Sequence, residues 1–250
     1  NKDKIKVSLK QGETKQEEII ITNTGEEKIK IDIDVEKIEH FVKVSEKTFE
    51  LGPGEKKTVE LSFIARENSK PDTYIGKIII KSGNVEKEIL VAIDINSKKT
   101  LFDLQVEILK KYLYVYPGEQ IIAKVKIFNL GEIGRVDVEI QYEIIDKDGK
   151  TIALSQEKAA VETQASLIKE IDIPQSAKEG DYILKVKLTY GESTAISSTF
   201  FFIGKKSYFE DNNVLMIIIV LVSVLIIILI SIKLRKLQRE NKKKVIIQYG

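Results

Sequence analysis

The stretch QGETKQEEIIITNTGE, residues 11–26, repeats its frame later in the chain, where residues 117–132 read PGEQIIAKVKIFNLGE. Gly12, Glu13, Asn23, Gly25 and Glu26 reappear at a spacing of 106 residues. In each copy a Gly-Glu turn precedes a mostly apolar run, and the run ends at an Asn-x-Gly turn. The repeat therefore predicts two copies of one domain. We expect Gly25 and Gly131 to relieve the cost of positive φ in that turn.

Apolar and polar side chains alternate through most of residues 1–204. The segment KIKVSLK places Ile5, Val7 and Leu9 on one face, and TVELSFIA does the same with alternate residues. Gly, Asn and Pro separate these runs. A period of two predicts antiparallel strands with one buried face, and strands at this density favour β-sandwiches. The predicted fold class is all-β, with two tandem Ig-like antiparallel β-sandwiches followed by one C-terminal transmembrane α-helix.

A second internal match supports the duplication. PDTYIGKIII recurs as EGDYILKVKL, which places Tyr74 and Tyr182 at the start of a late strand in each copy. In Ig-like sandwiches a tyrosine at this position forms a corner, because its hydroxyl bonds to nearby backbone. We predict domains over residues 1–95 and 102–204. The short polar segment 96–101 would link them closely.

One long apolar run, VLMIIIVLVSVLIIILISI, occupies residues 214–232 without a charge. A helix of this length spans roughly 28 Å, close to the ~30 Å thickness of a bilayer's hydrocarbon core. A lone segment in lipid satisfies its backbone hydrogen bonds only as a helix, and Ser223 and Ser231 would bond back to the preceding turn. The sequence therefore predicts a single membrane span, with membrane lipid as a partner.

The flanks of this run predict its orientation. The connector 205–213 is nearly balanced in charge, whereas the tail 233–250 is rich in Lys and Arg. Positive flanks stay in the cytoplasm, so the C-terminus is expected inside and the β-domains outside the cell. A cleaved signal peptide, removed from this numbering, would explain export. The residues expected to flank the membrane are Tyr208, Phe209, Lys233, Arg235 and Lys236.

Composition and motifs argue against catalysis and cofactors. The net charge of +2 and the absence of a basic cluster in the β-domains do not suggest a nucleic-acid partner. There is no cysteine, which excludes disulfides and Cys-based zinc sites. His40 is the only histidine, and no nucleophile-elbow or phosphate-loop motif is present. We predict that the protein is not an enzyme and that His40 is an exposed or half-buried strand residue.

The acidic residues are interpreted as structural. Asp32 and Asp34 lie two apart on a predicted strand and share its polar face, where paired acids could bind Ca²⁺ or serve a glycosidase. Solvated acids beside lysines are the favoured interpretation. The stretch DKDGK, residues 146–150, resembles the start of a calcium loop but lacks the bidentate Glu. An Asp-Gly hairpin turn is the better interpretation.

The aromatic stretch YLYVYP is the candidate partner-binding surface. Its three tyrosines alternate along an expected strand and would share one face, namely Tyr112, Tyr114 and Tyr116. Tyrosine rows bind sugars or proteins because they offer flat apolar area with a hydroxyl. The alternative is a tyrosine ladder that packs against the neighbouring strand.

The segment ITNTGEEKIKIDIDVE with FELGPGEKKTVELSF and PDTYIGKIII resembles the NEW3-type Ig-like modules of archaeal and bacterial surface proteins. The segment YVYPGEQIIAKVKIFNLGEIGRVDVEIQYEIIDKDGKTI with EGDYILKVKLTY is similar to CARDB-type modules, which are named for cell adhesion. The overall layout also resembles WxL-binding surface proteins of Gram-positive bacteria. These resemblances imply Ig-like ectodomains and carry no catalytic residue over to this chain.

The sequence thus predicts a non-catalytic cell-surface protein, single-pass in the cell membrane, acting in adhesion, scaffolding or the binding of a protein or glycan partner at the envelope. One alternative is an accessory subunit of a membrane complex that docks through its transmembrane helix. Another is a carbohydrate-binding or glycosidase module.

Overall fold

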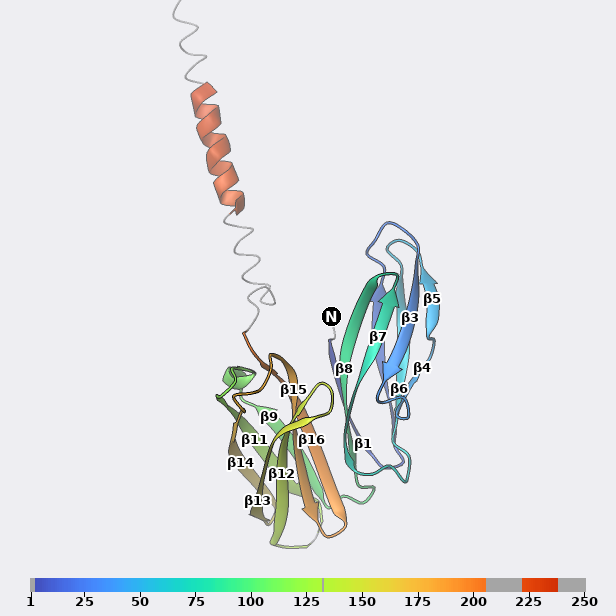
Figure 1. Ribbon diagram of the computed structural model, residues 1–250, viewed down its shortest axis with the longest axis vertical. Helices are drawn as coiled ribbons and strands as arrows, with labels where there is room; N and C mark the ends of the chain where they lie inside the picture. Colours follow the sequence, from blue (N-terminus) through green and yellow to red (C-terminus); the bar gives the residue numbers. More distant parts are fainter. Residues whose placement is uncertain (1–2, 132, 206–221, 238–250) are drawn as a thin grey trace, which may run out of the picture. The chain divides into compact units, whose positions relative to one another are not determined.

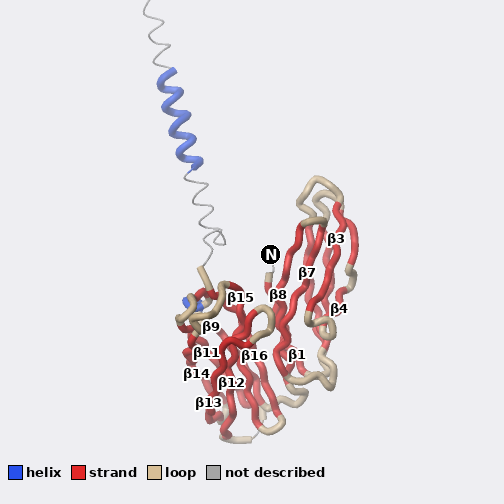
Figure 2. The backbone as a smooth tube through the Cα atoms, viewed as in Figure 1, coloured by secondary structure: helices blue, strands red, loops and turns tan. Residues whose placement is uncertain are grey.

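The computed structural model describes residues 3–131, 133–205 and 222–237 (Figure 1). The chain divides into two compact units, Asn1–Lys205 and Lys206–Gly250. The described part of the first unit contains sixteen strands and one short 3-10 helix. Strands dominate this unit, as Figure 2 shows in red. The predicted all-β, sandwich architecture of residues 1–204 is therefore confirmed.

The first sandwich contains two antiparallel-dominated sheets. Its five-stranded sheet has the order β1-β8-β7-β3-β5, and its three-stranded sheet has the order β2-β6-β4. Within the described residues of this sandwich, only the pairing of β1 with β8 is parallel. The strands are β1 (Lys4–Lys10), β2 (Thr14–Thr22), β3 (Ile29–Glu36), β4 (Val42–Val44), β5 (Thr48–Leu51), β6 (Lys56–Ile64), β7 (Asp72–Ser82) and β8 (Val85–Asn96).

The second sandwich also has a five-stranded and a three-stranded sheet, but the order of its smaller sheet differs. Its sheets have the orders β10-β16-β15-β12-β13 and β14-β11-β9, so β11 is paired on both sides. The segment between β8 and β9 falls within the predicted linker 96–101. The elements are β9 (Phe102–Ile108), η1 (Lys110–Tyr112), β10 (Tyr114–Val115), β11 (Gln120–Asn129), β12 (Val136–Asp146), β13 (Thr151–Val161), β14 (Gln164–Asp172), β15 (Gly180–Tyr190) and β16 (Ser193–Ile203).

Each sandwich has its own apolar core between its two sheets. In β6 the alternate residues Val59, Leu61 and Phe63 are fully buried, as the period of two predicts. Burying a side chain of this size stabilises the fold by roughly 1.5–3 kcal/mol. Gly76 in β7 leaves room for the backbone of Glu36, since a Cβ at Gly76 would lie 2.3 Å from that carbonyl oxygen.

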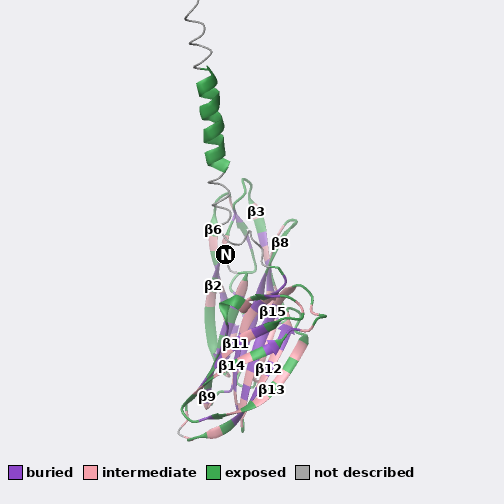
Figure 3. Ribbon diagram, turned by 90° about the vertical axis from the view of Figure 1, so that its left-hand side faces the viewer, coloured by how far each residue is buried: buried purple, intermediate pink, exposed green. Residues whose placement is uncertain are grey.

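A third buried layer lies on the outer faces of the two five-stranded sheets. Six buried apolar side chains belong to neither core, namely Ile79, Leu90, Ala92, Ile145, Ile183 and Ile196. Strand β16 contacts β8, β7 and β1 at this layer. The prediction that these strands have one buried face is therefore wrong for β7, β8, β12, β15 and β16, which carry buried side chains outside the two cores. Figure 3 colours the buried stretches purple.

The repeated turns have the same geometry in both sandwiches. Gly12 and Gly118 both have φ of +85°, a backbone conformation that favours glycine. Their amides donate to the carbonyl oxygens of Ala65 and Ile173, at 2.8 and 3.1 Å. The two sandwiches therefore share the repeated turn that the sequence predicted. Position 132 of the second copy lies outside the described residues.

The Asn-x-Gly turns work differently from the prediction. Gly25 and Gly131 do not have positive φ, so that expectation is wrong. Instead, each asparagine accepts the amide of the glycine two residues later, with Asn23 Oδ1 at 2.9 Å from the Gly25 nitrogen. The Asn23 side-chain amide also donates to three backbone carbonyl oxygens. The side chain therefore closes the turn, and the glycine backbone stays in an ordinary conformation.

Both tyrosine corners are confirmed. The hydroxyl of Tyr74 donates to the carbonyl oxygen of Lys70 at 2.9 Å, four residues upstream. The hydroxyl of Tyr182 donates to the carbonyl oxygen of Lys178 at 3.0 Å, again four residues upstream. This bond fixes the corner that leads into β7 and β15, in the manner known from Ig-like sandwiches.

The described part of the second unit is a single helix, residues 222–237, with every residue exposed (green in Figure 3). The Ser231 hydroxyl donates to the Ile227 carbonyl oxygen at 2.9 Å, which confirms the predicted back-bond. The helix continues past Ile232, so Lys233, Arg235 and Lys236 lie on it and not in a separate tail. Among the described residues, no helix is both long and apolar enough to span a membrane. Tyr208, Phe209 and positions 214–221 lie outside the described residues.

Candidate interaction surfaces

The three candidate tyrosines do not share one strand face. Tyr112 ends the short helix η1 and is half-buried, and Tyr114 belongs to the two-residue strand β10. Strand β9 belongs to the three-stranded sheet, whereas β10 belongs to the five-stranded sheet. The residues between them cross from one sheet to the other and therefore do not continue as a strand. The predicted row of three is therefore wrong. Tyr114 packs against Phe202 with ring centroids 6.0 Å apart, and Tyr116 is exposed.

The acidic candidates lie where solvated, lysine-paired acids are expected. Asp32 accepts from Thr48 at 2.8 Å and pairs with Lys30 at 3.1 Å, and Asp34 pairs with Lys81 at 3.1 Å. Within the described residues, no group of three or more His, Asp or Glu side chains could hold a metal ion. These acids serve as partners for surface lysines.

The remaining sequence candidates are turn residues. Asp146 caps the β12–β13 hairpin, because its side chain accepts the amides of Asp148 and Lys150, both at 2.9 Å. Gly149 in this turn has φ of +86°. The hairpin interpretation is confirmed. His40 is exposed in the turn between β3 and β4, so its expected exposure is right and its expected place in a strand is wrong.

Side chains of β8 and of the residue that follows it cap the amide edge of β16. Three alternate amides of β16 each donate to a side-chain oxygen of the first sandwich, at 2.7 to 3.0 Å. The donor and acceptor pairs are Thr194 with Ser97, Ile196 with Asn96, and Ser198 with Asp94. An unpaired strand edge is a template for unwanted pairing, and these caps occupy it. We refer to these pairs and the side chains around them as the joint.

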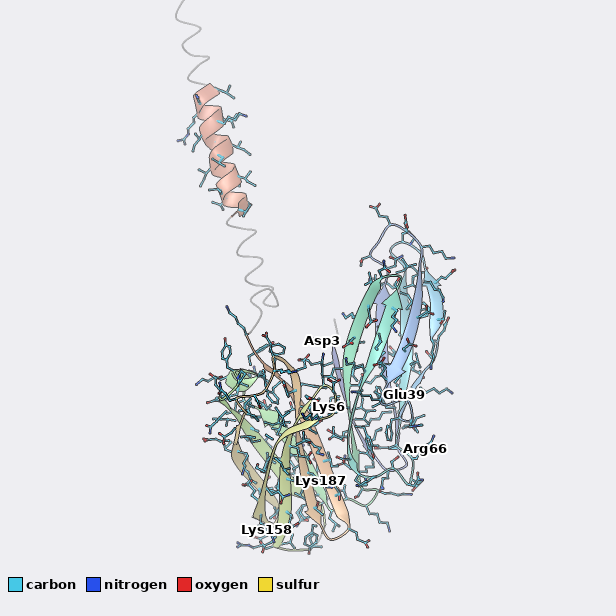
Figure 4. The ribbon with its side chains drawn as sticks, viewed as in Figure 1. Asp3, Lys6, Glu39, Arg66, Lys158 and Lys187 are labelled. Carbon is cyan, nitrogen blue, oxygen red and sulfur yellow. The ribbon has the colours of Figure 1, made fainter. Side chains whose placement is uncertain are left out.

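Asp94 is the central residue of the joint and is fully buried. Its carboxylate accepts the Ser198 amide at 2.8 Å, the Ser198 hydroxyl at 3.0 Å and the Thr73 hydroxyl at 2.7 Å. The Lys6 ammonium lies 3.8 Å away, on β1 (labelled in Figure 4). A buried carboxylate is tolerated only with such partners, because desolvation of the charge is costly.

Lys185 forms a second charged contact across the joint. Its ammonium lies 2.9 Å from Asp72 of the first sandwich and 2.9 Å from Glu143 of the second. Burial disfavours the charged ammonium, but the hydrogen bonds to Glu143 and Asp72 outweigh that effect. The pKa of Lys185 is therefore raised above its ordinary value. Lys185 is charged at neutral pH and holds one carboxylate from each sandwich.

A polar cluster closes the side of the second sandwich between β13 and β14. The Tyr142 hydroxyl donates to Glu157 at 2.5 Å, and the Lys169 ammonium lies 2.9 Å from Glu157 and 5.0 Å from the Tyr142 ring centroid. Burial raises the pKa of Tyr142 strongly, and the carboxylate beside it adds to this effect. Burial also works against ionisation of Glu157, but the hydrogen bonds from Tyr142 and Lys169 outweigh it and lower the pKa of Glu157.

The first sandwich has an open groove along β2. The groove measures about 490 Å³ and lies between β2 and the hairpin of β7 and β8. Its lining is mostly isoleucine and consists of Glu18, Ile19, Ile20, Ile21, Thr22, Ile80, Lys87 and Ile89. Among the described strands, β2 pairs along its backbone with β6. We refer to this feature as the β2 groove.

The sequence analysis did not predict the joint or the β2 groove, although the sequence contains a pattern that indicates each of them. The joint follows from continuous apolar runs, such as Ile89–Ile93, because strands buried on both faces do not alternate. Ile20 and Ile21 stand beside Ile19 in the very stretch that revealed the repeat, and Ile20 is 68% exposed. An exposed isoleucine on an edge strand marks a surface that is open to pairing.

No family model matches the chain, and no curated protein matches it either. The NEW3 and CARDB resemblance therefore stays a prediction. Among solved structures, the chain is similar to the CupB2 chaperone of Pseudomonas aeruginosa, with 9% identity, a TM-score of 0.30 and coverage of 78% of this chain and 96% of that one. A protein of unknown function from Porphyromonas gingivalis W83 matches with 12% identity, a TM-score of 0.40 and coverage of 79% and 96%.

The sporulation control protein Spo0M of Bacillus subtilis matches with 12% identity and a TM-score of 0.35, over 43% of this chain and 51% of that chain. At these scores the likenesses carry no argument about function.

Proposed function

We propose that the chain is a non-catalytic, membrane-anchored cell-surface protein that presents two joined β-sandwiches to a partner at the cell envelope. The observation that carries this proposal is the helix at residues 222–237, in which eleven large apolar side chains are all exposed. An isolated helix that is apolar on every side is stable in lipid and not in water. Residues 222–232 of this helix fall within the proposed span 214–232.

The charges along the helix support its proposed direction. Lys233, Arg235 and Lys236 follow the apolar part, and long basic side chains at a helix end reach the headgroup region. The proposed arrangement places the C-terminus in the cytoplasm and residues 1–204 outside. The exposed serine hydroxyl at position 231 is satisfied within the helix, as lipid requires.

The joint supports a role in display and binding. Two sandwiches that share buried, charged contacts form a firm platform, whereas a flexible linker would let each domain move alone. Asp32 and Asp34 pair with surface side chains, and His40 is exposed in a turn. We therefore propose binding as the work of this chain, with a protein partner at the envelope.

Cysteine labelling tests the topology, because the chain has no cysteine of its own. Asn84→Cys lies in the exposed turn between β7 and β8, and Lys243→Cys lies in the basic tail. On intact cells a membrane-impermeant maleimide should label the first variant, and it should label the second only after permeabilisation. Labelling of the tail variant on intact cells, with protection of the turn variant, would refute the proposed orientation.

A further inference from the structure

The chain leaves the second sandwich beside strand β10. This strand pairs in parallel with the last two residues of β16. The Phe202 amide donates to the Leu113 carbonyl oxygen at 2.9 Å. The Gly204 amide donates to the Val115 carbonyl oxygen at 2.8 Å. The short helix η1, which comes just before β10, lies at the same end of the sandwich (Figure 1). Residues 109–116 therefore lie next to the point at which the chain leaves.

This segment exposes apolar side chains together with lysines. Leu109, Tyr114 and Tyr116 are 38%, 38% and 51% exposed. Lys110 and Lys111 lie on η1, which has no buried residue. Single exposed apolar side chains are common on protein surfaces, whereas a group of them marks a site of interaction. We refer to these five residues as the exit patch.

The first sandwich has polar residues at the equivalent exposed positions. Ser8 and Lys10 stand 106 residues before the two tyrosines of the exit patch, and both are exposed. The residue between the two positions is apolar and buried in each copy, as Leu9 and as Val115. Strand β1 pairs in parallel with β8, as β10 does with β16. Packing within a sandwich therefore explains the buried residue in both copies, but it does not account for exposed tyrosines in the second copy alone.

The charge of the exit patch is positive. Residues 109–116 contain two lysines and no acid. Two acids at the same end are directed toward local donors: Glu119 accepts the Tyr116 amide at 2.8 Å, and Asp172 accepts from the Gln120 side chain at 2.7 Å. Glu179 is exposed beside the end of β16 and adds one opposing charge. The lysines of the patch can therefore meet an anionic surface with few acids between them and it.

The covalent connection to the proposed membrane span keeps this end of the sandwich near the bilayer. The proposed span begins at Val214, nine residues after Lys205. Nine residues reach at most about 30 Å when fully extended. Strand β16 has eleven residues and is about 35 Å long, so the opposite end of the sandwich is farther from the anchor along the chain. The proposed anchor therefore holds the exit patch within reach of the lipid headgroups.

We propose that the exit patch docks on the headgroup layer of the bilayer and sets the second sandwich end-on against the membrane. Tyrosine is favoured at headgroup level because its ring is apolar and its hydroxyl is polar. Lysines near an anionic membrane surface are attracted to the lipid phosphates. The patch combines both kinds of residue with Leu109. This inference rests on the proposed membrane anchor and adds the surface through which the β-domains meet the lipid.

A polarity-sensitive fluorescent label on a single cysteine tests the docking in the full chain, which has no cysteine of its own. Tyr116→Cys places the aromatic label in the exit patch, and Glu192→Cys places it in the exposed turn between β15 and β16 at the opposite end. In nanodiscs that contain anionic lipid, lipids spin-labelled at the headgroup should quench the label at position 116 strongly and the label at position 192 weakly.

The outcomes separate the docking from the anchor. Equal quenching of the two labels, in chains that have entered the nanodiscs, would overturn the docking and leave the anchor standing. A patch that binds a protein partner instead would give this result, because the label at position 116 would stay in water. Chains that do not enter the nanodiscs would refute the anchor, and the docking with it.

Matched substitutions test the chemistry of the patch in the chain labelled at position 116. Lys111→Gln should lower the ratio of docked to undocked chain about fivefold, equivalent to about 1 kcal/mol. Lys126→Gln removes an exposed lysine from β11 and should leave the ratio unchanged. Leu109→Ser should also lower the ratio, whereas Leu130→Ser, which removes a 58% exposed side chain at the opposite end, should not. If the patch variants behaved like their controls, the proposal would be wrong.

Discussion

Removal of the Asp94 carboxylate is expected to open the joint between the two sandwiches. Asp94→Ala deletes the acceptor of three hydrogen bonds, two from Ser198 and one from Thr73. These donors are then left without a partner in a site where Asp94 is 0% exposed. The two apolar cores do not include Asp94, so each sandwich is expected to stay folded.

The size of the effect follows from the chemistry of the lost contacts. A hydrogen bond to a charged group contributes about 1.5–3 kcal/mol, and such bonds within one network are not additive. Loss of one partner from a buried charged pair costs about 3–5 kcal/mol. We expect the joint to lose about 3 kcal/mol, which is roughly a hundredfold increase in the open population.

Amide hydrogen exchange at residues 194–198 measures this opening. The Ser198 amide should exchange roughly a hundredfold faster in Asp94→Ala than in the wild type, because its acceptor is gone. Asp34→Ala is the matched control, since Asp34 lies on the same sheet and pairs with Lys81 in an exposed contact. Such a pair contributes about 0–1 kcal/mol. If both variants changed the exchange of Ser198 equally, the role assigned to the joint would be wrong.

Three further changes test the sandwiches themselves. Gly76→Ala should destabilise the first sandwich by about 2–3 kcal/mol in thermal unfolding. The added Cβ would lie 2.3 Å from a backbone oxygen that cannot rotate away. A loss of stability below about 0.5 kcal/mol would contradict the packing described. In urea unfolding, Asn23→Ala should lower the free energy of unfolding by about 2–3 kcal/mol and Asn129→Ala by about 1 kcal/mol. Asn23 is 2% exposed, and its side chain donates to three carbonyl oxygens, whereas Asn129 donates to two. A larger loss in Asn129→Ala would contradict this reasoning. The lowered pKa of Glu157 gives stability that is present above its ordinary pKa of 4.5 and is lost as the pH falls through its lower folded value. Tyr142→Phe should reduce the dependence of the free energy of unfolding on acidic pH, measured in urea titrations. If that pH dependence stayed the same, the contact between Tyr142 and Glu157 would not be its cause.

The strands and corners were predictable because their causes are local. Alternation in β1, β6 and β9 reports one buried face directly, and the tyrosine corners need only a bond to a carbonyl four residues away. The repeat also predicted that two domains share one plan. These features depend on residues that lie close together in the sequence.

The surfaces of interest were harder to predict because they depend on which sheets meet. The prediction of a tyrosine row was wrong because the chain crosses from one sheet to the other between β9 and β10. The alternation of apolar and polar residues gives no indication of such a crossing. Burial of Asp94 depends on Ser198, which is 104 residues away. The β2 groove depends on how β2 packs beside the hairpin of β7 and β8, which lies about 60 residues further along the chain.

The parallel pairing of β1 with β8 has a mechanical consequence. The pairing joins seven residues of each strand, from Lys4 with Leu90 to Lys10 with Asn96. When tension pulls the start of β1 away from the end of β8, the two strands slide along each other, and all the bonds between them carry load together. Such a shear geometry resists force better than a hairpin that unzips one bond at a time. If the proposed anchor places the chain under tension, this arrangement would keep the first sandwich folded under load.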